Sequence, residues 1–525
     1  MRPPAGGGES IAKAGRRAGR GVCGGACAAR AVGRAIARRA YARWGAIARR
    51  AGVVWEPSAA MALRRPRDAW IWGLAALGAA GAALRFSTLS VQSFWLDEAV
   101  THQLVTRTFG SMLSAIPHSE STPPLYYVLA WAWVRVFGAG EAGLRSLSAL
   151  FGTVTIVLLA LIARRLAGDR AGLAAAALCA TSPLLIWYSQ EARAYALLVA
   201  LCALTLWCLL REDWRGWAIA AALALATHYF AVFVVVPELA WLLWRHARSS
   251  RTAAWSAGFV VAVAAALSPL AIVQAGGNRA AFIHSTALGG RVAAVPKQFL
   301  IGYATPHAVV LTILAAAFAL ALVPALRRSD RALVVLAAFA VAVPVAMALL
   351  GADYLITRNL IAAMVPLVVL AGVAASRTRY GVALIAGLCA VGVIAFAGVE
   401  GNAFYQRDDW RAVAAALGPA THGPRVVDVN PSDGVPALEI YAPLHLLAQG
   451  QPVSTREVDV IDLQHNPPAV TAPVELAGFT LCAPPTHTAE FDLVRYCAPA
   501  AMSLPFGEVL KVRLAALYPS VLGGG

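Results

Sequence analysis

Residues 143–163 read GLRSLSALFGTVTIVLLALIA, and the basic pair Arg164-Arg165 follows directly. As an α-helix this stretch extends over about 31 Å, which matches a membrane hydrocarbon core about 30 Å thick. Positive charge in a short loop marks the cytoplasmic end of a membrane span. The stretch therefore predicts a transmembrane helix that runs from the outer face of a membrane to the cytoplasm.

The same pattern recurs along residues 69–400. Apolar runs that approach the length of a span lie at 69–86, 143–163, 171–188, 194–210, 216–228, 231–244, 254–274, 307–326, 332–350, 359–376 and 381–399. Basic loops lie at 164–170, 211–215, 245–251, 327–331 and 377–379, and they alternate with loops poor in positive charge. The basic loops should face the cytoplasm. We therefore expect a mainly α, polytopic protein of the cell membrane with about eleven transmembrane helices. Its N-terminus should be cytoplasmic and its C-terminal region extracytoplasmic.

The segment Pro124–Phe137 (PLYYVLAWAWVRVF) is apolar but is not counted among the spans. As a helix it would extend over only about 21 Å, too short to cross the hydrocarbon core. Its Trp and Tyr residues suit the membrane–water interface. We expect a helix against the outer leaflet, within a first outer loop of residues 87–142.

Composition separates a basic arm from a nearly neutral body. The chain has 525 residues, 59% of them hydrophobic and 14% charged, with a net charge of +17. A soluble protein has about 25% charged residues, so an ordinary soluble enzyme is disfavoured. Residues 1–67 carry 15 Lys and Arg against 2 acidic residues, which accounts for most of the net charge.

We interpret residues 1–68 as a disordered cytoplasmic arm. Two alternatives remain: translation that begins at Met61, and a basic amphipathic helix on an anionic membrane surface. We do not expect nucleic-acid binding, because neither stacking aromatic residues nor a nucleic-acid motif accompanies the basic residues.

Residues 401–525 break the apolar pattern and predict a small α/β domain outside the membrane. A helix is expected at Arg411–Leu417, a strand at Val426–Val429 and a second helix at Val435–Tyr441. Cys482 and Cys497 lie in this region. They can form a disulfide in an oxidising outer compartment, and the sequence leaves open whether they do.

The predicted topology gathers polar side chains on the outer face. They are Asp97, Glu98, Arg145, Glu191, Arg193, Tyr195, His228, Tyr229 and Arg358. Carboxylates among aromatic residues and arginines suit an amphiphilic anionic substrate, because an Arg guanidinium matches phosphate oxygens and a desolvated carboxylate can act as a general base. The simpler alternatives are that Asp97 and Glu98 cap a loop helix and that the arginines bind lipid headgroups.

Several of these residues belong to motifs that resemble one family. The motifs are Trp95-Leu96-Asp97-Glu98-Ala99, Pro123-Pro124-Leu125-Tyr126-Tyr127, Gly140-Glu141 with Leu144-Arg145-Ser146, Ser189-Gln190-Glu191-Ala192-Arg193-Ala194-Tyr195, Thr227-His228-Tyr229 and Asp409-Trp410-Arg411. In order and spacing they resemble the GT-C glycosyltransferases over roughly residues 69–445. More narrowly they are similar to bacterial relatives of the protein O-mannosyltransferases (glycosyltransferase family 39) and of the lipid A aminoarabinose transferase.

The resemblance implies a GT-C fold and an enzyme that moves a sugar from a polyprenyl-phosphate donor to an acceptor hydroxyl on the outer face. If the transfer is a single displacement, it inverts the anomeric carbon. It implies a hexosyl- or pentosyltransferase, with mannosyl transfer among the possibilities, and an acceptor that is a glycan, a lipid or a protein. Asp97, with Glu98 beside it, would stand at the reacting centre, and Arg145, Arg193 and Arg358 would bind the donor phosphate. Glu191, Tyr195, His228 and Tyr229 would complete the substrate site.

The sequence departs from the family at two places. Thr122 stands where a His commonly precedes the Pro-Pro pair, and Leu197 and Leu198 fill a region where some relatives carry an Asp. A second acidic role would then fall to Glu191. We assign no metal ligands, although a divalent ion could assist the reaction.

Two alternatives belong to other functional classes. A transporter or flippase for a lipid-linked saccharide would need polar residues near the middle of several spans, and beyond Glu238 the sequence offers few. A membrane anchor or assembly factor for the C-terminal domain would need no group of polar residues on the outer face.

Overall fold

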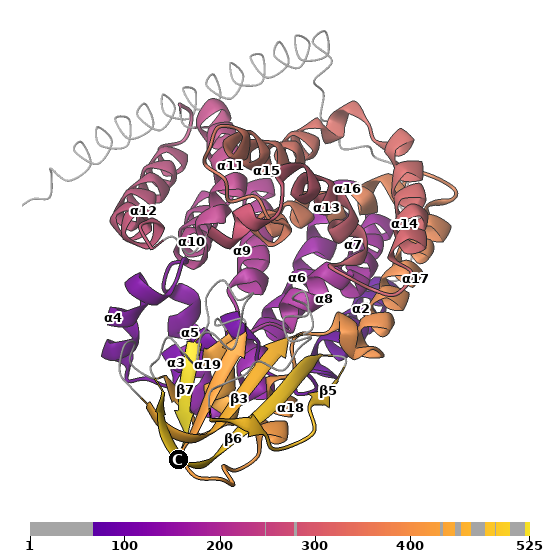
Figure 1. Ribbon diagram of the computed structural model, residues 1–525. Coiled ribbons are helices and arrows are strands. Elements are labelled where there is room, and N and C mark those ends of the chain that lie inside the picture. Colours follow the sequence, from indigo (N-terminus) through magenta and orange to yellow (C-terminus); the bar gives the residue numbers. More distant parts are fainter. Residues whose placement is uncertain are drawn as a thin grey trace, which may run out of the picture. The chain divides into compact units, whose positions relative to one another are not determined.

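A computed structural model describes residues 67–246, 248–277, 281–430, 434–446, 453–463, 478–488, 490–504 and 520–524 (Figure 1). Residues 66–326 and 332–525 form one compact unit, so the helical region and the C-terminal region pack together. The arm expected over residues 1–68 lies outside the described residues except for its last two positions.

A helix occupies the position of each predicted apolar run. These helices are α2 (Arg67–Phe86), α6 (Glu141–Ala167), α7 (Asp169–Thr181) with α8 (Pro183–Ser189), α9 (Tyr195–Leu210), α10 (Trp214–Thr227), α11 (Val232–Arg245), α12 (Arg251–Ala275), α14 (Ala308–Leu322), α15 (Arg331–Leu349), the 3₁₀ segment η5 (Thr357–Ala363) with α16 (Met364–Ala375), and α17 (Gly381–Glu400). The run 171–188 differs from the expectation of one straight helix, because α7 and α8 are bent by 60°. Proline has no backbone N–H to continue a helical ladder, and Pro183 is the first residue of α8.

Among the described residues, seven helices are long and apolar enough to cross a membrane, or eight if α7 and α8 form one broken span. Helices α9, α10 and α11 have 16, 14 and 14 residues and fall below that length. The polytopic helical architecture is therefore confirmed, whereas the number of eleven crossings and the orientation stay predictions.

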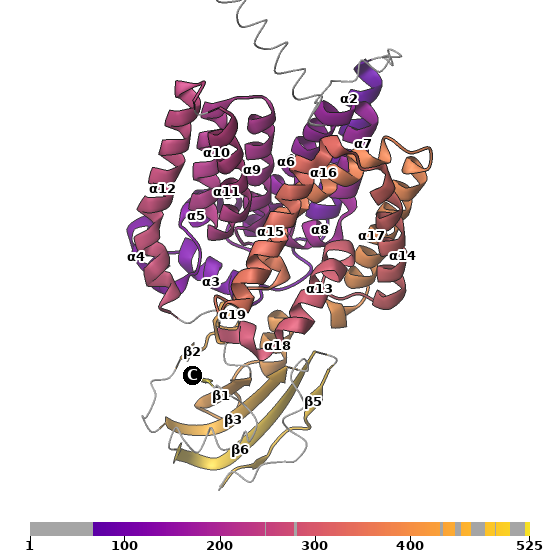
Figure 2. The ribbon, with the colours of Figure 1, turned by 90° about the horizontal axis from the view of Figure 1, so that it is seen from above.

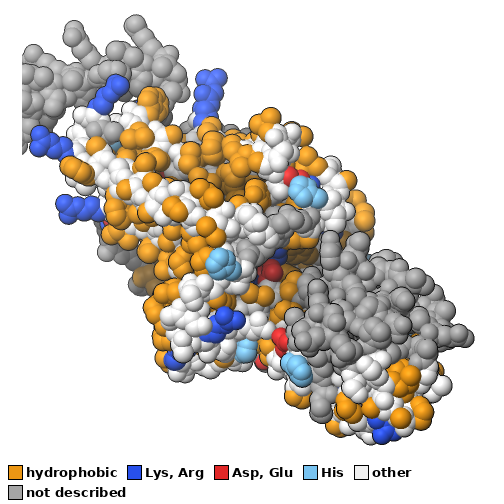
Figure 3. Space-filling view, turned by 60° about the vertical axis from the view of Figure 1, so that its left-hand side comes forward, with side chains coloured by type: hydrophobic (Ala, Val, Ile, Leu, Met, Phe, Trp, Pro, Cys, Tyr) orange, Lys and Arg blue, Asp and Glu red, His pale blue; other side chains and the backbone are white. Residues whose placement is uncertain are grey.

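The surface of the helical region is strongly apolar. Trp255, Leu350 and Val382 are each at least 80% exposed, and hydrophobic side chains cover much of this region in Figure 3. Extended apolar patches of this kind are unusual on soluble monomers and mark membrane or partner contacts. Lipid contact along these helices is the simplest explanation.

The first outer loop folds into the short helices α3 (Leu96–Val105), α4 (Phe109–Ser119) and α5 (Leu125–Phe137). Helix α5 has 13 residues, so the helix expected at Pro124–Phe137 is present. Its buried residues Tyr126, Tyr127 and Ala130 pack into the main hydrophobic core together with residues of α6 and α9. A further helix, α13 (Leu288–Ile301), precedes α14.

The C-terminal region is a small α/β domain, as predicted. Its elements are α18 (Trp410–Leu417), β1 (Arg425–Asn430), α19 (Val435–Tyr441), β2 (His445–Leu446), β3 (Val453–Leu463), β4 (Thr480–Leu481), β5 (Thr486–His487), β6 (Phe491–Leu504) and β7 (Ser520–Gly524). The strand order is β2-β7-β1-β3-β6-β4, with β5 also pairing with β6. Strands β1 and β3 are parallel, and the other pairings are antiparallel.

This domain joins the helical region through its two helices. Trp410 of α18 and Leu438 of α19 share a buried core with Ile461 of β3 and with Ala99 of α3, and Figure 2 shows α18 and α19 between the sheet and the long helices. Cys482 and Cys497 form a disulfide. The pairing that the sequence left open is thus present in the structure.

Candidate active site

Asp97 lies in the first turn of α3 and pairs with an arginine 261 positions later in the chain. Its Oδ2 accepts a hydrogen bond of 2.8 Å from Arg358 of η5. The side chains of Asp97 and Arg358 are 22% and 16% exposed, so water reaches both partners. Two segments that are distant in sequence therefore meet at an accessible carboxylate–guanidinium pair.

Glu98, the next residue, belongs to a fully buried ion pair. Its two carboxylate oxygens accept hydrogen bonds of 2.7 and 2.5 Å from Arg145 at the start of α6, and Oε1 also accepts one of 2.8 Å from the backbone N–H of Ala192. Burial alone would raise the pKa of Glu98, but the Arg145 guanidinium outweighs that effect and holds the pKa below its ordinary value. The carboxyl is therefore ionised and fixes three segments against one another.

Arg145 has no N–H group left for a substrate. Besides its two bonds to Glu98, it donates to the backbone oxygens of Leu89, Gln92 and Ser93, and a guanidinium has five N–H donors in total. The side chain is 1% exposed. The sequence-based expectation that Arg145 binds a donor phosphate does not fit this placement, and neither does a direct catalytic role for Glu98.

Arg193, on the loop between α8 and α9, is also held by protein groups. It donates hydrogen bonds of 2.8 and 3.0 Å to the carboxylate of Glu120. It donates further bonds of 3.2 Å to the backbone oxygen of Asp97 and to Thr101 Oγ1. Its guanidinium therefore fixes the first turn of α3. Glu120 was not among the predicted site residues, although a carboxylate in the first outer loop is a natural partner for an outer-face arginine.

Glu191, two residues before Arg193 on the same loop, is completely buried. Its Oε2 accepts a hydrogen bond of 3.3 Å from Arg407, and among the described residues its Oε1 has no hydrogen-bond partner. Burial raises the pKa of the Glu191 carboxyl to about 7, although Arg407 acts in the opposite direction. The residue therefore changes protonation near neutral pH.

Arg407 comes from the beginning of the C-terminal domain, and we did not predict it. Its guanidinium lies 4.0 Å from the ring centre of Trp187 and donates to Gln92 Oε1. A signal was present in the sequence, since Arg407 lies two residues before the Asp409-Trp410-Arg411 motif. The contact itself depends on how the two domains pack.

Aromatic side chains line one side of the site. Ring centres lie 4.7 Å apart for Tyr188 and Tyr195 and 5.4 Å apart for Tyr195 and His228, and the hydroxyls of Tyr188 and Tyr303 share a hydrogen bond. His228 is buried, and its Nδ1 accepts a hydrogen bond of 3.2 Å from the backbone N–H of Phe230. Nothing local in the sequence singled out Tyr303.

Tyr229 is engaged elsewhere. Its hydroxyl donates a hydrogen bond of 2.7 Å to Gln274 of α12. Gln274 in turn donates to the backbone oxygens of Ile116 and Thr122. Tyr229 thus takes part in a link between α12 and residues 116–122, and a substrate contact of this residue stays a prediction.

The C-terminal domain also holds the chain just before Asp97. The hydroxyl of Tyr441 accepts a hydrogen bond of 2.8 Å from the backbone N–H of Phe94 and donates one of 2.7 Å to Glu141. Ser93 Oγ donates to the backbone oxygen of Asp408 at 2.9 Å. Two adjacent residues just before α3, Ser93 and Phe94, are therefore held by the C-terminal region.

In the described part of the chain, one group of side chains has metal-ligand spacing: His422, Cys482 and Cys497. The two cysteines are joined in the disulfide, so their sulfurs cannot act as thiolate ligands. Assistance by a divalent ion stays a hypothesis.

Comparison with known proteins supports the fold. A family model described as dolichyl-phosphate-mannose-protein mannosyltransferase matches residues 121–273, and no curated protein matches the sequence. The crystal structure of ArnT from Cupriavidus metallidurans in the apo state is similar, with a TM-score of 0.55, 14% sequence identity, and coverage of 82% of this chain and 98% of that one. The same protein bound to undecaprenyl phosphate gives a TM-score of 0.50, 15% identity and the same coverage. The predicted GT-C fold and the resemblance to this group are thereby confirmed.

The buried ion pair gives a test of stability. Replacing Glu98→Gln leaves the Arg145 charge buried without compensation, which should lower the free energy of unfolding by about 3 kcal/mol or more. The measurement is the thermal unfolding midpoint of the detergent-solubilised protein. Asp169→Asn is the matched control, because Asp169 and its partner Arg164 are 49% and 39% exposed and such a pair contributes about 1 kcal/mol or less. If both variants lowered the unfolding midpoint equally, the buried Glu98–Arg145 pair would not be a major contributor to stability.

Glu191 should make stability depend on pH. Because burial raises its folded pKa from 4.5 to about 7, the folded state binds the proton more tightly than the unfolded state does. Its contribution is therefore complete below pH 4.5 and is lost as pH rises through 7. Between pH 5 and pH 8 the unfolding midpoint of the unmodified protein should fall more than that of Glu191→Gln, by roughly a few degrees. Parallel curves for the two proteins would refute the raised pKa.

Proposed function

We propose that this chain is a membrane glycosyltransferase that transfers a sugar from a polyprenyl-phosphate donor to an acceptor hydroxyl, with inversion. The carrying observation is the Asp97–Arg358 pair. Its two side chains are partly exposed, whereas the neighbouring Glu98–Arg145 pair is almost completely buried. The fold is shared with ArnT, whose structure contains undecaprenyl phosphate.

Asp97 is the proposed general base. A carboxylate that is partly withdrawn from water can accept the proton of a hydroxyl in the transition state. Among the described residues, Arg358 is the side chain that donates a hydrogen bond to the Asp97 carboxylate. If an incoming phosphate takes over that guanidinium, the carboxylate becomes free for the acceptor.

Arg358 is the proposed phosphate-binding residue. A guanidinium pairs well with phosphate oxygens. Among the described residues, the side chain of Arg358 donates to Asp97 alone, while Arg145 and Arg193 each hold several protein oxygens. We therefore assign Arg145, Arg193 and Glu98 to holding α3 in place.

The reaction is a single displacement. The acceptor oxygen forms a bond to the anomeric carbon as the bond from that carbon to the phosphate oxygen breaks, and the hydroxyl proton passes to Asp97. The polyprenyl phosphate leaves with the bonding electron pair, and Arg358 stabilises the charge that develops on it. Attack from the face opposite the leaving group inverts the anomeric carbon.

Glu191, Tyr195 and His228 are proposed to border the bound sugar. Glu191 Oε1 is a buried acceptor with no protein partner among the described residues, and the His228 ring lies against Tyr195. A sugar hydroxyl could donate to Glu191, and the rings offer flat apolar surfaces. We place this site on the outer face of the cell membrane, with the N-terminus in the cytoplasm and the C-terminal domain outside.

Glu238 gives no support to the transporter alternative. Its carboxyl accepts a hydrogen bond of 2.9 Å from Trp217 and contacts Thr205 Oγ1 at 3.2 Å, and it is 2% exposed. These bonds join α9, α10 and α11. The residue is thereby explained as a structural link between three short helices.

Asp97→Asn tests the proposed base. It keeps the shape of the side chain but removes its basicity, so transfer should fall by at least about 100-fold. Membranes that contain each variant are supplied with labelled undecaprenyl-phosphate sugars one at a time, and the labelled product is quantified. Asp169→Asn controls for expression and membrane insertion. Full activity of Asp97→Asn would eliminate Asp97 as the base.

Arg358→Gln tests phosphate recognition. Loss of a charge-assisted contact with phosphate should weaken donor binding by about tenfold or more. Binding of undecaprenyl phosphate to the detergent-solubilised protein measures this directly, without catalysis. The matched control is Arg164→Gln. Arg164 lies in the last turn of α6, and its side chain is 39% exposed. Unchanged affinity in Arg358→Gln would mean that another residue binds the phosphate.

A further inference from the structure

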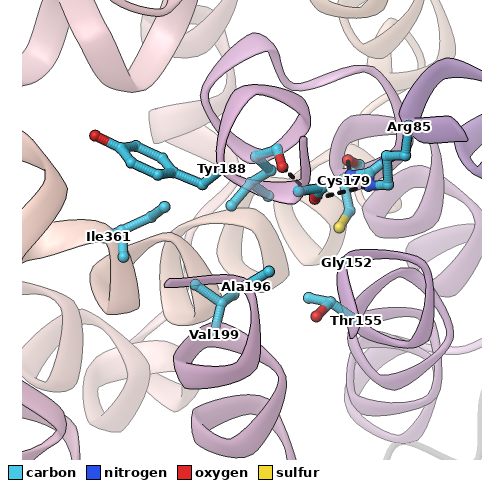
Figure 4. A pocket seen from close by; sticks show the side chains of 10 residues that line it. Arg85, Gly152, Thr155, Cys179, Tyr188, Ala196, Val199 and Ile361 are labelled. Carbon is cyan, nitrogen blue, oxygen red and sulfur yellow. Dashed lines mark hydrogen bonds between the residues drawn. The ribbon is translucent and has the colours of Figure 1, made fainter. Parts of the chain in front are cut away.

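Arg85, in the last turn of α2, is completely buried and takes no part in the mechanism above. Its guanidinium donates to the backbone oxygens of Cys179, Ala180 and Gly81 at 2.8, 3.1 and 2.9 Å. Its Nε donates to Ser189 Oγ at 3.1 Å. Figure 4 shows Arg85 pointing toward Cys179, with its hydrogen bonds to Cys179 and Ser189 dashed. One side chain of α2 therefore reaches both sides of the bend between α7 and α8.

The bend between α7 and α8 leaves backbone carbonyl groups at the end of α7 without their usual N–H donors. In an α-helix the N–H of each residue bonds to the carbonyl four positions earlier, so Cys179 would pair with residue 183. Residue 183 is a proline and has no N–H to give. Arg85 supplies the missing donor to Cys179 and a second one to Ala180. It thereby satisfies carbonyl groups that would otherwise be unpaired in the apolar interior.

The same carbonyl groups stabilise the arginine. Gly81 belongs to the C-terminal half of α2, and Cys179 and Ala180 belong to the last turn of α7. The C-terminus of a helix carries a partial negative charge of about half an electron. The C-terminal end of α7 thus faces the Arg85 guanidinium, and Gly81 O of α2 itself accepts a third bond.

The packing around Arg85 is tight. A Cβ at Gly152 of α6 would lie 2.0 Å from Ser189 Oγ and 3.0 Å from Arg85 Nε, so glycine is required where α6 passes this contact. The cavity beside it, lined by Thr155, Tyr188 and Ile361 among others, has a volume of about 10 Å³. That space suits no more than about one water molecule.

The contact continues into the candidate active site. Ser189 is the last residue of α8, and the next residue, Gln190, donates to Leu84 O and Thr88 Oγ1 at 3.0 and 2.7 Å. Two positions further, the N–H of Ala192 bonds to Glu98, and Arg193 bonds to the first turn of α3. The loop 189–193 is therefore held by the end of α2 on one side and by α3 on the other.

We propose that Arg85 is a positioning residue, which supplies the backbone donors lost at Pro183 and so fixes the bend of α7–α8 that places Glu191 and Arg193 in the active site. The structural part of this proposal is independent of the chemistry. Its catalytic consequence rests on the proposed glycosyltransferase function.

Hydrogen–deuterium exchange of the full-length protein in detergent tests the structural part. Arg85→Met fills similar space without donors, so amides of residues 184–193 should exchange at least tenfold faster, with Arg85→Lys intermediate. Adding Pro183→Ala to Arg85→Met restores a backbone N–H at position 183, which would pair with Cys179 in a continuous helix, and should recover part of the protection. Arg164→Met, on an exposed part of α6, should leave this segment unchanged.

Unchanged exchange of residues 184–193 in Arg85→Met would overturn the proposal, because it would show that Arg85 only fills space. If Arg85→Met does not fold, Arg85→Lys and Ser189→Ala replace it. Unchanged exchange in both of those variants would overturn the proposal equally.

Kinetics separate positioning from general stability. In Arg85→Lys the kcat for transfer from a labelled undecaprenyl-phosphate sugar should fall at least tenfold. The KM for that donor should change less than threefold, because Arg358 is untouched, and kcat is measured at a temperature at which the variant is fully folded. A kcat equal to that of the unmodified protein would overturn the catalytic part. If the unmodified protein transfers none of the sugars offered, the proposed function fails, while the exchange result still decides the role of Arg85.

Discussion

The buried ion pair between Glu98 and Arg145 is the contact on which the arrangement of the site depends. Removing two charges from water is costly, and a buried pair is tolerated when its geometry is good and its remaining hydrogen-bonding groups are satisfied. Here all five donors of Arg145 and both oxygens of Glu98 are used. Because their partners lie on the segment before α3, on α6 and at Ala192, any large shift of these segments would leave a charge unpaired. Asp97 is the residue before Glu98, so the ion pair that fixes Glu98 also fixes the backbone of Asp97.

The three ion pairs that involve Asp97, Glu98 and Glu120 differ in how much of their side chains water reaches. Glu98–Arg145 and Glu120–Arg193 have side chains at most 10% exposed, and each links segments that are distant in sequence. Asp97–Arg358 is more exposed, and Arg358 makes fewer hydrogen bonds to protein groups than Arg145 or Arg193. A pair in contact with water loses less when it separates. The same residue types thus form buried supporting contacts in one place and a partly exposed pair in another, which we propose as the substrate-binding pair.

The C-terminal domain is part of the site even though its composition sets it apart from the helical region. Arg407 reaches Glu191, and Tyr441 holds the backbone N–H of Phe94 just ahead of α3. A second contact holds the same loop: Arg85 of α2 bonds to Cys179 of α7 and to Ser189 of α8, across the break between these two helices. The loop that carries Glu191 and Arg193 therefore lies between two anchors, one from the first long helix and one from the chain beyond the last.

The sequence by itself determined the local features of this protein. The apolar runs located the helices because burial in lipid requires long uninterrupted apolar segments, and Val435–Tyr441 was predicted with its observed ends because a short amphipathic pattern is a local property. The motifs around Asp97 and Arg193 indicated the GT-C fold and the outer-loop residues. Tertiary structure decided the roles of those residues. Arg145, Arg193 and Arg358 are alike in sequence, and what separates them is how many oxygens surround each guanidinium and how much water reaches it. Glu120, Tyr303 and Arg407 entered the site through contacts between distant segments, and no pattern along the chain encodes such contacts.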